Sequence, residues 1–302
     1  MPQTQTSWFD LPNGLLLSNG TVEIGVTTSI GPRIAAYRLK GGENILGRAV
    51  GTLDKPNEWH PWGGHRVWIA PEDPVKSYGL DNSPVAHELI GTRGVRLTQP
   101  VEPKTHVQKQ LVVTLDERGT GVSVENRLTN RGTAPMQLAT WGLTIMNGGG
   151  TAILPQEPFK RHEDEFLPAR PLVLWHYTDL ADPRWQHGPR FLRLQGDATK
   201  STPQKVGIGN RLGWVAYARE GLLFVKRVPF DPKATYTDMG CNFEVYTEAA
   251  FFEVESLGPL VTVKPGETAS HTERWHLFDK VSIAKDDASL EKTLAPLIAQ
   301  TA

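Results

Sequence analysis

Hydrophobic and polar residues alternate along many short segments of the chain, a pattern typical of half-buried strands. In segment 21–27, for example, Val22, Ile24 and Val26 fall on one face. The clearest segments of this kind are 21–27, 66–70, 107–115, 121–128, 136–146, 191–195, 205–208, 214–219, 222–228, 242–247, 251–257 and 271–278. We therefore expect strands to dominate from one end of the chain to the other.

Turn residues separate these segments, and one segment has a helical pattern. Segment 286–300 places four apolar residues on one helical face: Leu290, Leu294, Leu297 and Ile298. Asp286 or Asp287 can cap its start, whereas Pro296 would strain its last turns. The turn signals are Asn13-Gly14, Asn19-Gly20, Gly41-Gly42, 130–132, 147–150 and Pro265-Gly266.

The pattern predicts an all-β fold in which two large antiparallel sheets pack face to face, with a short terminal helix. No linker of low complexity, repeat or long charge block divides the 302 residues. We therefore expect residues 1–302 to form a single domain, because large sandwiches often exceed the usual domain size. The longest irregular regions, 155–171 and 178–189, are too polar for a core and are candidates for functional loops.

Charge and composition narrow the choice of partner. Lys and Arg number 32 against 33 Asp and Glu, and the pI is about 6.8, so no strong field favours nucleic acid or an anionic membrane. A neutral or weakly charged small molecule is the expected partner, and the oligomeric state is left open. The single cysteine, Cys241, fits a reducing compartment, and the first residues lack a secretory pattern. We therefore expect a cytoplasmic protein without membrane-spanning segments.

Several enzyme signatures are missing from the sequence. It has no phosphate-binding loop, no Gly-x-Ser-x-Gly and no His-Glu-x-x-His, and the glycines of 207–213 open no helix. His60 and His65 stand five residues apart, which is not a typical ligand spacing. We therefore expect neither a metal nor another cofactor.

The first candidate site lies in segment 58–73, EWHPWGGHRVWIAPED, which reads as a loop leading into a strand. A pyranose offers hydroxyl groups to polar side chains and a C–H face to aromatic rings. The segment supplies ring faces from Trp59, Trp62 and Trp68, and polar groups from His65, Arg66 and Glu72. It therefore favours sugar binding. The alternative is that Trp68 belongs to the core while Trp59 and Trp62 cover a sheet edge.

The second candidate site lies in segment 239–260, which contains Glu244, Glu248, Glu253 and Glu255. Glu253 and Glu255 share one face of the predicted strand 251–257. Two carboxylates on one face of an apolar strand are costly when buried without partners. That face is therefore either exposed to water or part of a site.

The sequence resembles galactose mutarotase and its aldose 1-epimerase relatives, most closely the uncharacterised DUF4380 branch. The resemblance spans roughly residues 20–278. It is carried by IGPRIAAYRLKGGENIL (30–46), GGHRVWIAPE (63–72), VSVENRLTNRGTAPMQLATWGLTIM (122–146) and VYTEAAFFEVESLGP (245–259). It implies a β-supersandwich that binds a hexose on a concave sheet face.

The resemblance also implies catalytic roles. In the epimerases a glutamate takes the proton of the anomeric hydroxyl, and this role falls on Glu255, with Glu253 as neighbour and rival. A histidine of the middle strand donates the second proton, but here that strand reads LATWGLTIM and places Trp141 or a neighbour there. His65, or His176 as a second choice, could replace the missing acid.

Other residues are candidates for substrate binding. Asp179, Asp182, Arg184 and Trp185 could close over the ligand, although solvated loop residues are the alternative. The full set of predicted binding residues is Arg66, Trp62, Trp68, Glu72, Trp141, Glu244, Glu253, Asp179, Arg184 and Trp185.

Three functions stay open at this point. The first is a carbohydrate-active enzyme that acts at the anomeric centre, or a lyase or hydrolase on the same scaffold. The second is a sugar-binding protein without catalysis, and the third is an interaction domain without a ligand.

Overall fold

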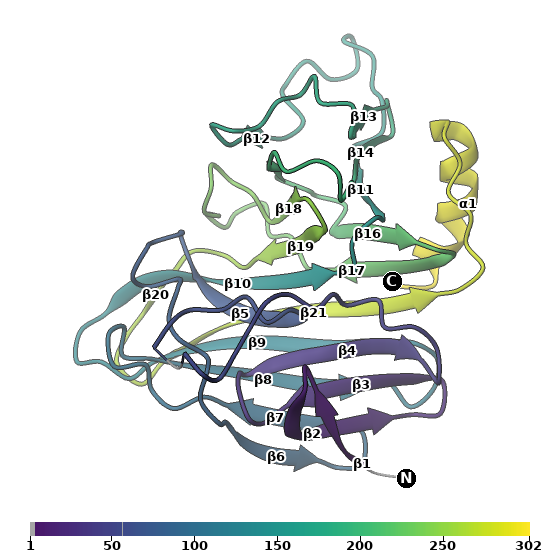
Figure 1. Ribbon diagram of the computed structural model, residues 1–302. Helices are drawn as coiled ribbons and strands as arrows, with labels where there is room; N and C mark the ends of the chain where they lie inside the picture. Colours follow the sequence, from purple (N-terminus) through teal and green to yellow (C-terminus); the bar gives the residue numbers. More distant parts are fainter. Residues whose placement is uncertain (1–3, 56) are drawn as a thin grey trace.

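Two antiparallel sheets packed face to face form the protein in a computed structural model that describes residues 4–55 and 57–302 (Figure 1). The all-β prediction is confirmed. The 11-stranded sheet runs in the order β1 (Thr4–Trp8), β2 (Leu11–Ser18), β3 (Val22–Thr27), β4 (Arg33–Leu39), β5 (His65–Ala70), β10 (Met136–Met146), β19 (Phe251–Leu257), β18 (Phe243–Glu248), β15 (Gln204–Ile208) and β12 (Leu172–Leu174), and β20 (Val261–Val263) pairs with β10.

The 10-stranded sheet covers one face of the 11-stranded sheet. Its order is β13 (Trp185–His187), β14 (Phe191–Gln195), β11 (Thr151–Pro155), β16 (Trp214–Arg219), β17 (Leu222–Arg227), β21 (Thr268–Phe278), β9 (Val122–Asn130), β8 (Val107–Leu115), β7 (Gly94–Thr98) and β6 (Ala86–Ile90). Each sheet therefore has an inner face toward the other sheet and an outer face.

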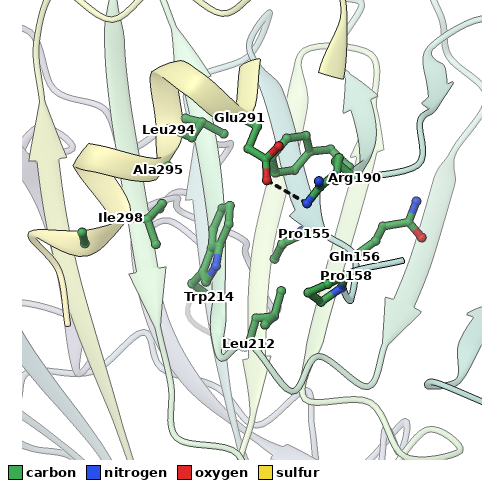
Figure 2. Close-up of a pocket in the computed structure, with 12 residues that line it drawn as sticks. Pro155, Gln156, Pro158, Arg190, Leu212, Trp214, Glu291, Leu294, Ala295 and Ile298 are labelled. Atoms are coloured by element: carbon green, nitrogen blue, oxygen red, sulfur yellow. Dashed lines mark hydrogen bonds and ion pairs between the residues drawn. The ribbon is translucent and has the colours of Figure 1, made fainter. Parts of the chain in front are cut away.

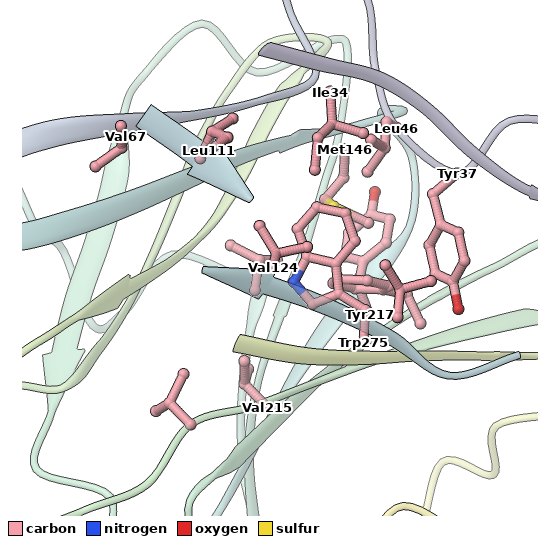
Figure 3. Packing of buried hydrophobic residues seen from close by; sticks show 14 of the residues in the cluster. Ile34, Tyr37, Leu46, Val67, Leu111, Val124, Met146, Val215, Tyr217 and Trp275 are labelled. Atoms are coloured by element: carbon pink, nitrogen blue, oxygen red, sulfur yellow. The ribbon is translucent and has the colours of Figure 1, made fainter. Parts of the chain in front are cut away.

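The main hydrophobic core fills the space between the inner faces (Figure 3). Val67 of β5 and Leu111 of β8 lie in this core, and Tyr37 and Trp275 contact each other there with ring centroids 5.8 Å apart. In β8, buried and partly exposed residues alternate along the whole strand, because only one face of the strand meets the core.

The predicted C-terminal helix is confirmed as α1 (Asp287–Ala299), which lies on the outer face of the 10-stranded sheet beside β16 and β17 (Figure 1). Asp286 is the N-cap and accepts a hydrogen bond from the Ser289 backbone, and Leu290 and Leu294 are buried. The helix has 13 residues, and the described part of the chain contains no helix long and apolar enough to span a membrane.

Several features of the fold differ from the sequence prediction. The Asn13-Gly14 pair lies inside β2 and not between strands, with Asn13 at a φ of 64°. Nine strands were not predicted: β1, β2, β4, β6, β7, β11, β12, β13 and β20. In β4, five of the seven residues are buried, so the alternating pattern is lost. The assignment of residues 1–302 to a single domain stays a prediction.

Candidate functional site

The two sequence clusters meet on the outer face of the 11-stranded sheet. Leu143 of β10 lies opposite Arg66 of β5 on one side and opposite Glu255 of β19 on the other. Glu255 in turn lies directly opposite Glu244 of β18. Directly opposed residues point to the same face of a sheet, so Arg66, Glu255 and Glu244 form one row across four strands. We call this part of the outer face the carboxylate face.

Lys205 of β15 joins the two buried carboxylates of this row. Its Nζ lies 2.7 Å from Oε2 of Glu244 and 3.2 Å from Oε2 of Glu255, and all three side chains are buried. The same Nζ lies 5.0 Å from the ring centroid of Trp141 and 4.6 Å from that of Trp175. Trp141 Nε1 also donates a hydrogen bond of 2.8 Å to Glu255 Oε2. Ring faces and carboxylates together therefore compensate the buried ammonium group.

Burial and neighbouring charges set the protonation of this cluster. Burial raises the pKa of Glu244 well above its usual value, and the charge of Glu255 raises it further, against the lowering effect of Lys205. Burial alone would lower the pKa of Lys205, but Glu244 and Glu255 raise it well above its usual value. At neutral pH we therefore expect Glu244 to hold a proton and Lys205 to be charged.

Glu253 is the accessible carboxyl group of the carboxylate face. It lies two residues before Glu255 on the same side of β19, opposite Tyr246 of β18, and is partly exposed. Among the residues described, its carboxyl group makes no hydrogen bond or ion pair. Burial by its neighbours and then the charge of Glu255 raise its pKa to about 8, although Arg66 and Lys205 lower it. Glu253 can therefore exchange a proton with a ligand near neutral pH.

Arg66 lies between two tryptophan rings at one side of the carboxylate face. Its Cζ atom is 4.7 Å from the ring centroid of Trp59 and 4.4 Å from that of Trp68. Burial lowers its pKa to about 10, so the guanidinium group stays charged at neutral pH. Its Nη1 donates a long hydrogen bond of 3.4 Å to the His60 carbonyl, and its buried Nε has no partner among the described residues. Arg66 thus retains hydrogen-bonding capacity.

Aromatic rings line both sides of the face. On the Arg66 side, Trp68 contacts Trp141 and Tyr78 with ring centroids 5.3 Å and 4.7 Å apart. Tyr78 donates a hydrogen bond of 2.6 Å to Glu72 Oε1, which places Glu72 at the edge of the face. The opposite side has Trp175 over Lys205 and a Tyr177–Tyr246 ring pair 6.4 Å apart. Rings and polar groups alternate, an arrangement suited to a ligand with apolar faces and polar edges.

His65 does not reach the carboxylate face, which corrects the expectation that it acts opposite Glu255. Because side chains alternate along β5, His65 points between the sheets while Arg66 points outward. Its Nδ1 is 2.9 Å from Thr144 Oγ1 and its Nε2 is 3.0 Å from Asn126 Oδ1. Burial lowers its pKa to about 4, so the ring is neutral at physiological pH.

Trp62 is also absent from the carboxylate face. It is buried in a separate cluster with Leu11 and Ile30, and its Nε1 donates a hydrogen bond of 3.0 Å to Asn82 Oδ1. Trp62 therefore supports the loop that carries Trp59, which corrects its predicted contact with a ligand.

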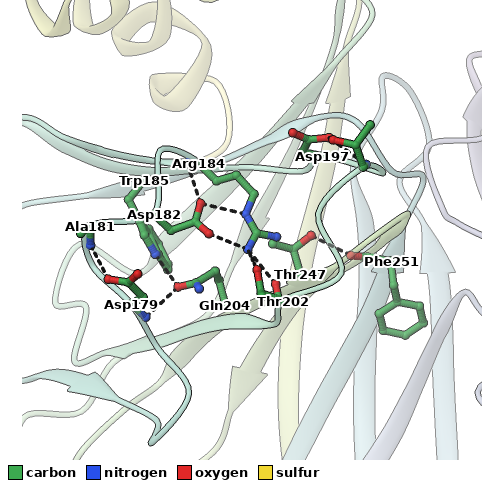
Figure 4. A network of polar contacts seen from close by, with 11 residues as sticks. Asp179, Ala181, Asp182, Arg184, Trp185, Asp197, Thr202, Gln204, Thr247 and Phe251 are labelled. Atoms are coloured by element: carbon green, nitrogen blue, oxygen red, sulfur yellow. Dashed lines mark hydrogen bonds and ion pairs between the residues drawn. The ribbon is translucent and has the colours of Figure 1, made fainter.

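The predicted lid residues Asp179, Arg184 and Trp185 bind to the protein itself (Figure 4). Arg184 Nη2 donates to Asp182 Oδ2 at 2.9 Å and to the Thr202 carbonyl at 2.7 Å. Trp185 is buried, and its Nε1 donates to Gln204 Oε1 at 2.8 Å. Asp179 Oδ1 accepts from the Ala181 backbone at 2.8 Å. These contacts brace the start of β15, and none of the three residues lies on the carboxylate face.

Three residues of the carboxylate face were not predicted from the sequence: Lys205, Trp175 and Tyr246. A lysine at the start of an alternating strand is usually solvated, and nothing in the sequence links position 205 to positions 244 and 255. The one available signal was the predicted pair of carboxylates. Buried carboxylates need a cation or hydrogen-bond donors, so the pair implied a partner of this kind.

A pocket of about 370 Å³ lies elsewhere, between α1 and the outer face of the 10-stranded sheet (Figure 2). Its lining is mostly apolar and includes Trp214, Leu294 and Ile298. The charged groups at its edge, Arg190 and Glu291, pair with each other at 2.8 Å. Their charges are therefore compensated without a ligand. Within residues 4–55 and 57–302, no group of three His, Cys, Asp or Glu side chains is arranged to hold a metal ion.

Comparison with known proteins identifies the fold. No family model and no curated protein matches the chain. The Slr1438 protein of Synechocystis sp. PCC 6803 has a similar structure, with a TM-score of 0.59 and 12% identity over 92% of this chain and 99% of its own. A galactose mutarotase-like protein from Lactobacillus casei ATCC 334 has a TM-score of 0.56 and 13% identity over 88% of this chain and 100% of its own.

A galactose mutarotase related enzyme from Lactobacillus acidophilus is similar as well. Its TM-score is 0.53 and its identity 10%, over 88% of this chain and 98% of its own. Identities this low establish a common fold and not a common activity. The placement in the DUF4380 branch stays a prediction. Over most of its length, the chain has the fold of the galactose mutarotase-like proteins.

Proposed function

We propose that the carboxylate face binds a hexose-type sugar and that Glu253 and Glu255 act together in proton exchange at its anomeric centre. The observation that carries the proposal is the setting of Glu253, a partly exposed carboxyl group with a pKa of about 8 among aromatic rings. A group that titrates near the working pH is suited to general acid–base chemistry.

The surroundings of Glu253 suit a neutral sugar. The rings of Trp59 and Tyr246 flank the face and offer surfaces for the C–H face of a pyranose. Arg66 Nε and Glu72, at the edge, supply a hydrogen-bond donor and acceptors for hydroxyl groups. Because Lys205 is already paired with two carboxylates, an anionic ligand group would compete with them.

The proposed reaction interconverts the two anomers. Glu253, protonated at neutral pH, gives its proton to the ring oxygen, while the proton of the anomeric hydroxyl group passes to Glu255, whose buried Oε1 has no hydrogen-bond partner among the described residues. The C1–O5 bond breaks and an open-chain aldehyde forms. Rotation about C1–C2 and the reverse proton transfers close the ring with the other configuration. Both carboxyl groups take part in the reaction, since the charge of Glu255 raises the pKa of Glu253 and so favours its protonated form.

A second candidate function is sugar binding without turnover. It is favoured by Trp141, which stands where the resemblance leads one to expect an acid and whose indole donates to Glu255 instead. An indole N–H is a donor and does not transfer its proton. In this case the carboxylate face would bind a sugar while Glu255 stays bound to Trp141 and Lys205.

The test is the Glu253→Gln variant, which keeps the shape of the side chain but removes its titration. Anomer exchange would be followed by NMR on a panel of neutral hexoses, pentoses and uronic acids, with binding followed by titration calorimetry. We expect exchange to fall by about 100-fold or more while binding changes little. Glu125→Gln, on the outer face of the 10-stranded sheet, is the matched control and should match the parent protein.

The outcomes separate the candidates. Binding without exchange in the parent protein would replace the enzymatic proposal with the second candidate. Failure of every sugar in the panel to bind would overturn both.

A further inference from the structure

A fully buried ion pair lies behind the carboxylate face, between the two sheets. Lys226 of β17 and Glu273 of β21 both belong to the 10-stranded sheet, and Nζ and Oε2 are 3.2 Å apart. Neither side chain is exposed at all. The pair contacts the inner side of the strands whose outer side carries Glu253 and Glu255. We call Lys226 and Glu273 the inter-sheet pair.

Lys226 holds the two central strands of the 11-stranded sheet together. Its Nζ donates to the Val254 carbonyl at 2.9 Å and to Thr144 Oγ1 at 2.7 Å. Val254 stands between Glu253 and Glu255, and Thr144 is its partner across β10 and β19. With Glu273, these contacts use all three donors of the ammonium group.

Glu273 binds the residue on the other side of Glu255. Its Oε1 accepts a hydrogen bond of 2.7 Å from Ser256 Oγ, and its Oε2 accepts one of 2.6 Å from Trp275 Nε1. Both sequence neighbours of Glu255, Val254 and Ser256, are therefore fixed by the inter-sheet pair.

Neutral histidines complete the network. His65 bridges Thr144 and Asn126, and His271 Nε2 lies 2.9 Å from Ser256 Oγ. Burial lowers the pKa of each ring to about 4. Since Ser256 donates to Glu273, the His271 Nε2–H group donates to Ser256. Every link in this chain thus has a defined direction.

The backbone leaves room for this network. Gly142 of β10 lies opposite Ser256, and a Cβ atom there would overlap Oε1 of Glu273 and crowd the His65 ring. Glycine at this position lets the carboxylate of one sheet approach the backbone of the other.

The energy of a buried ion pair does not by itself explain its presence. Replacing such a pair with apolar side chains of similar volume is often neutral or stabilising, because two charges no longer have to be desolvated. Apolar side chains cannot supply the hydrogen bonds to Val254, Thr144 and Ser256.

We propose that Lys226 and Glu273 are positioning residues, which fix β19 from the inside so that Glu253 and Glu255 hold their relative orientation on the outside. This inference rests on the proposed function. It assigns a role in the site to residues of the opposite sheet that cannot contact a substrate.

The test is the double variant Lys226→Met with Glu273→Leu, which removes both charges and leaves neither unpaired. We expect a cooperative thermal transition, sugar affinity within a few-fold of the parent protein and a kcat at least 10-fold lower. Lys109→Met with Glu102→Leu is the matched control, because this pair is also buried, with Nζ and Oε1 2.7 Å apart, but lies in β8 and the preceding loop. The control should keep the parent kcat.

A second readout does not depend on catalysis. The Glu253 carboxyl group can be titrated by NMR with 13C-labelled glutamate, assigned through Glu253→Gln. Its midpoint should shift in the inter-sheet double variant and not in the control. Parent-like kcat and an unchanged midpoint would overturn the inference.

The readouts also separate this inference from the proposed function. If the parent protein shows no turnover, the proposed function fails and the Glu253 midpoint alone decides on positioning. If the double variant does not fold, Ser256→Ala replaces it, since it removes one bond to Glu273 next to Glu255. An unchanged midpoint and kcat in Ser256→Ala would then count against the inference.

Discussion

Single residues set the charge of the carboxylate face. Lys205 is the cation between Glu244 and Glu255, which lie directly opposite each other and would repel if both were ionised without it. Its charge also lowers the pKa of Glu253. One side chain thus lowers the pKa of two carboxyl groups, Glu244 and Glu253.

We expect Lys205→Met to destabilise the protein by about 3–5 kcal/mol at pH 8, because removing one partner leaves buried carboxylates without a cation. The loss should be smaller at pH 5. Burial raises the pKa of the Glu244 and Glu253 carboxyl groups in the folded protein. The stability that depends on their protonation is therefore greatest at low pH and is lost as the pH rises. Urea unfolding at both pH values measures this, with Lys264→Met, in an exposed position, as the control.

An equal loss for Lys205→Met at the two pH values would contradict this assignment of charge. So would a Glu253 midpoint that stays at the parent value in the variant.

The difference between His65 and Arg66 is one position in a strand, and it decides their roles. Both are polar and both follow Gly64, but alternation sends one inward and the other outward. All six residues of β5 are buried, so the sequence pattern does not tell which face is the outer one. The site residue Arg66 was predicted, whereas the role of His65 needed the sheet packing.

At the scale of elements, β10 connects the site to the interior. Nine of its residues in succession, 138–146, are buried, with Trp141 and Leu143 on the outer side and Gly142 and Thr144 on the inner side. The strand therefore contacts both the inter-sheet network and the carboxylate face.

We expect Gly142→Ala to destabilise the protein by about 1–3 kcal/mol, because the new methyl group would overlap Glu273 Oε1 in a closely packed interior. Equilibrium unfolding in urea measures the loss. Gly132→Ala is the comparison, since its nearest non-neighbouring atom would be 3.2 Å away and its loss should stay below that of Gly142→Ala. Equal losses would show that the space beside Glu273 is not limiting.

The longest alternating strands and the terminal helix were predicted well. The alternating strands β8 and β9 and the capped helix α1 are confirmed, because solvent on one side leaves a readable period. Nine strands were missed: β4, the three-residue strands β12, β13 and β20, and β1, β2, β6, β7 and β11. Burial of β4 removes the alternation, and β12 has only three residues.

At the scale of the whole molecule, the interior between the sheets contains charged and titratable groups as well as apolar side chains. His65 and His271 are both buried and neutral, with pKa values lowered by burial to about 4. Unfolding returns each to a pKa near 6.5. Between pH 6.5 and 4 the unfolded chain therefore binds protons that the folded protein does not.

This difference predicts how stability depends on pH. The carboxyl groups of Glu244 and Glu253 titrate with the opposite sign, so the histidine contribution is best isolated by a variant. Relative to His271→Gln, the parent protein should lose about 1.4 kcal/mol per pH unit as the pH falls from 6.5 toward 4. Urea unfolding at pH 7, 6 and 5 measures the two curves. Parallel curves would show that His271 is not held neutral in the folded state.

The sequence by itself determined the strand content, the terminal helix, and the shared face of Glu253 and Glu255, because these depend on local period and on neighbours along the chain. Only the tertiary structure decided that this face meets Arg66 and Lys205, that His65 turns inward, and that Lys226 and Glu273 stand behind it. These contacts join residues 17 to 112 positions apart across hydrogen-bonded strands and packed sheets. Strand order and the choice of inner face follow from burying the whole chain at once, and no local pattern encodes them.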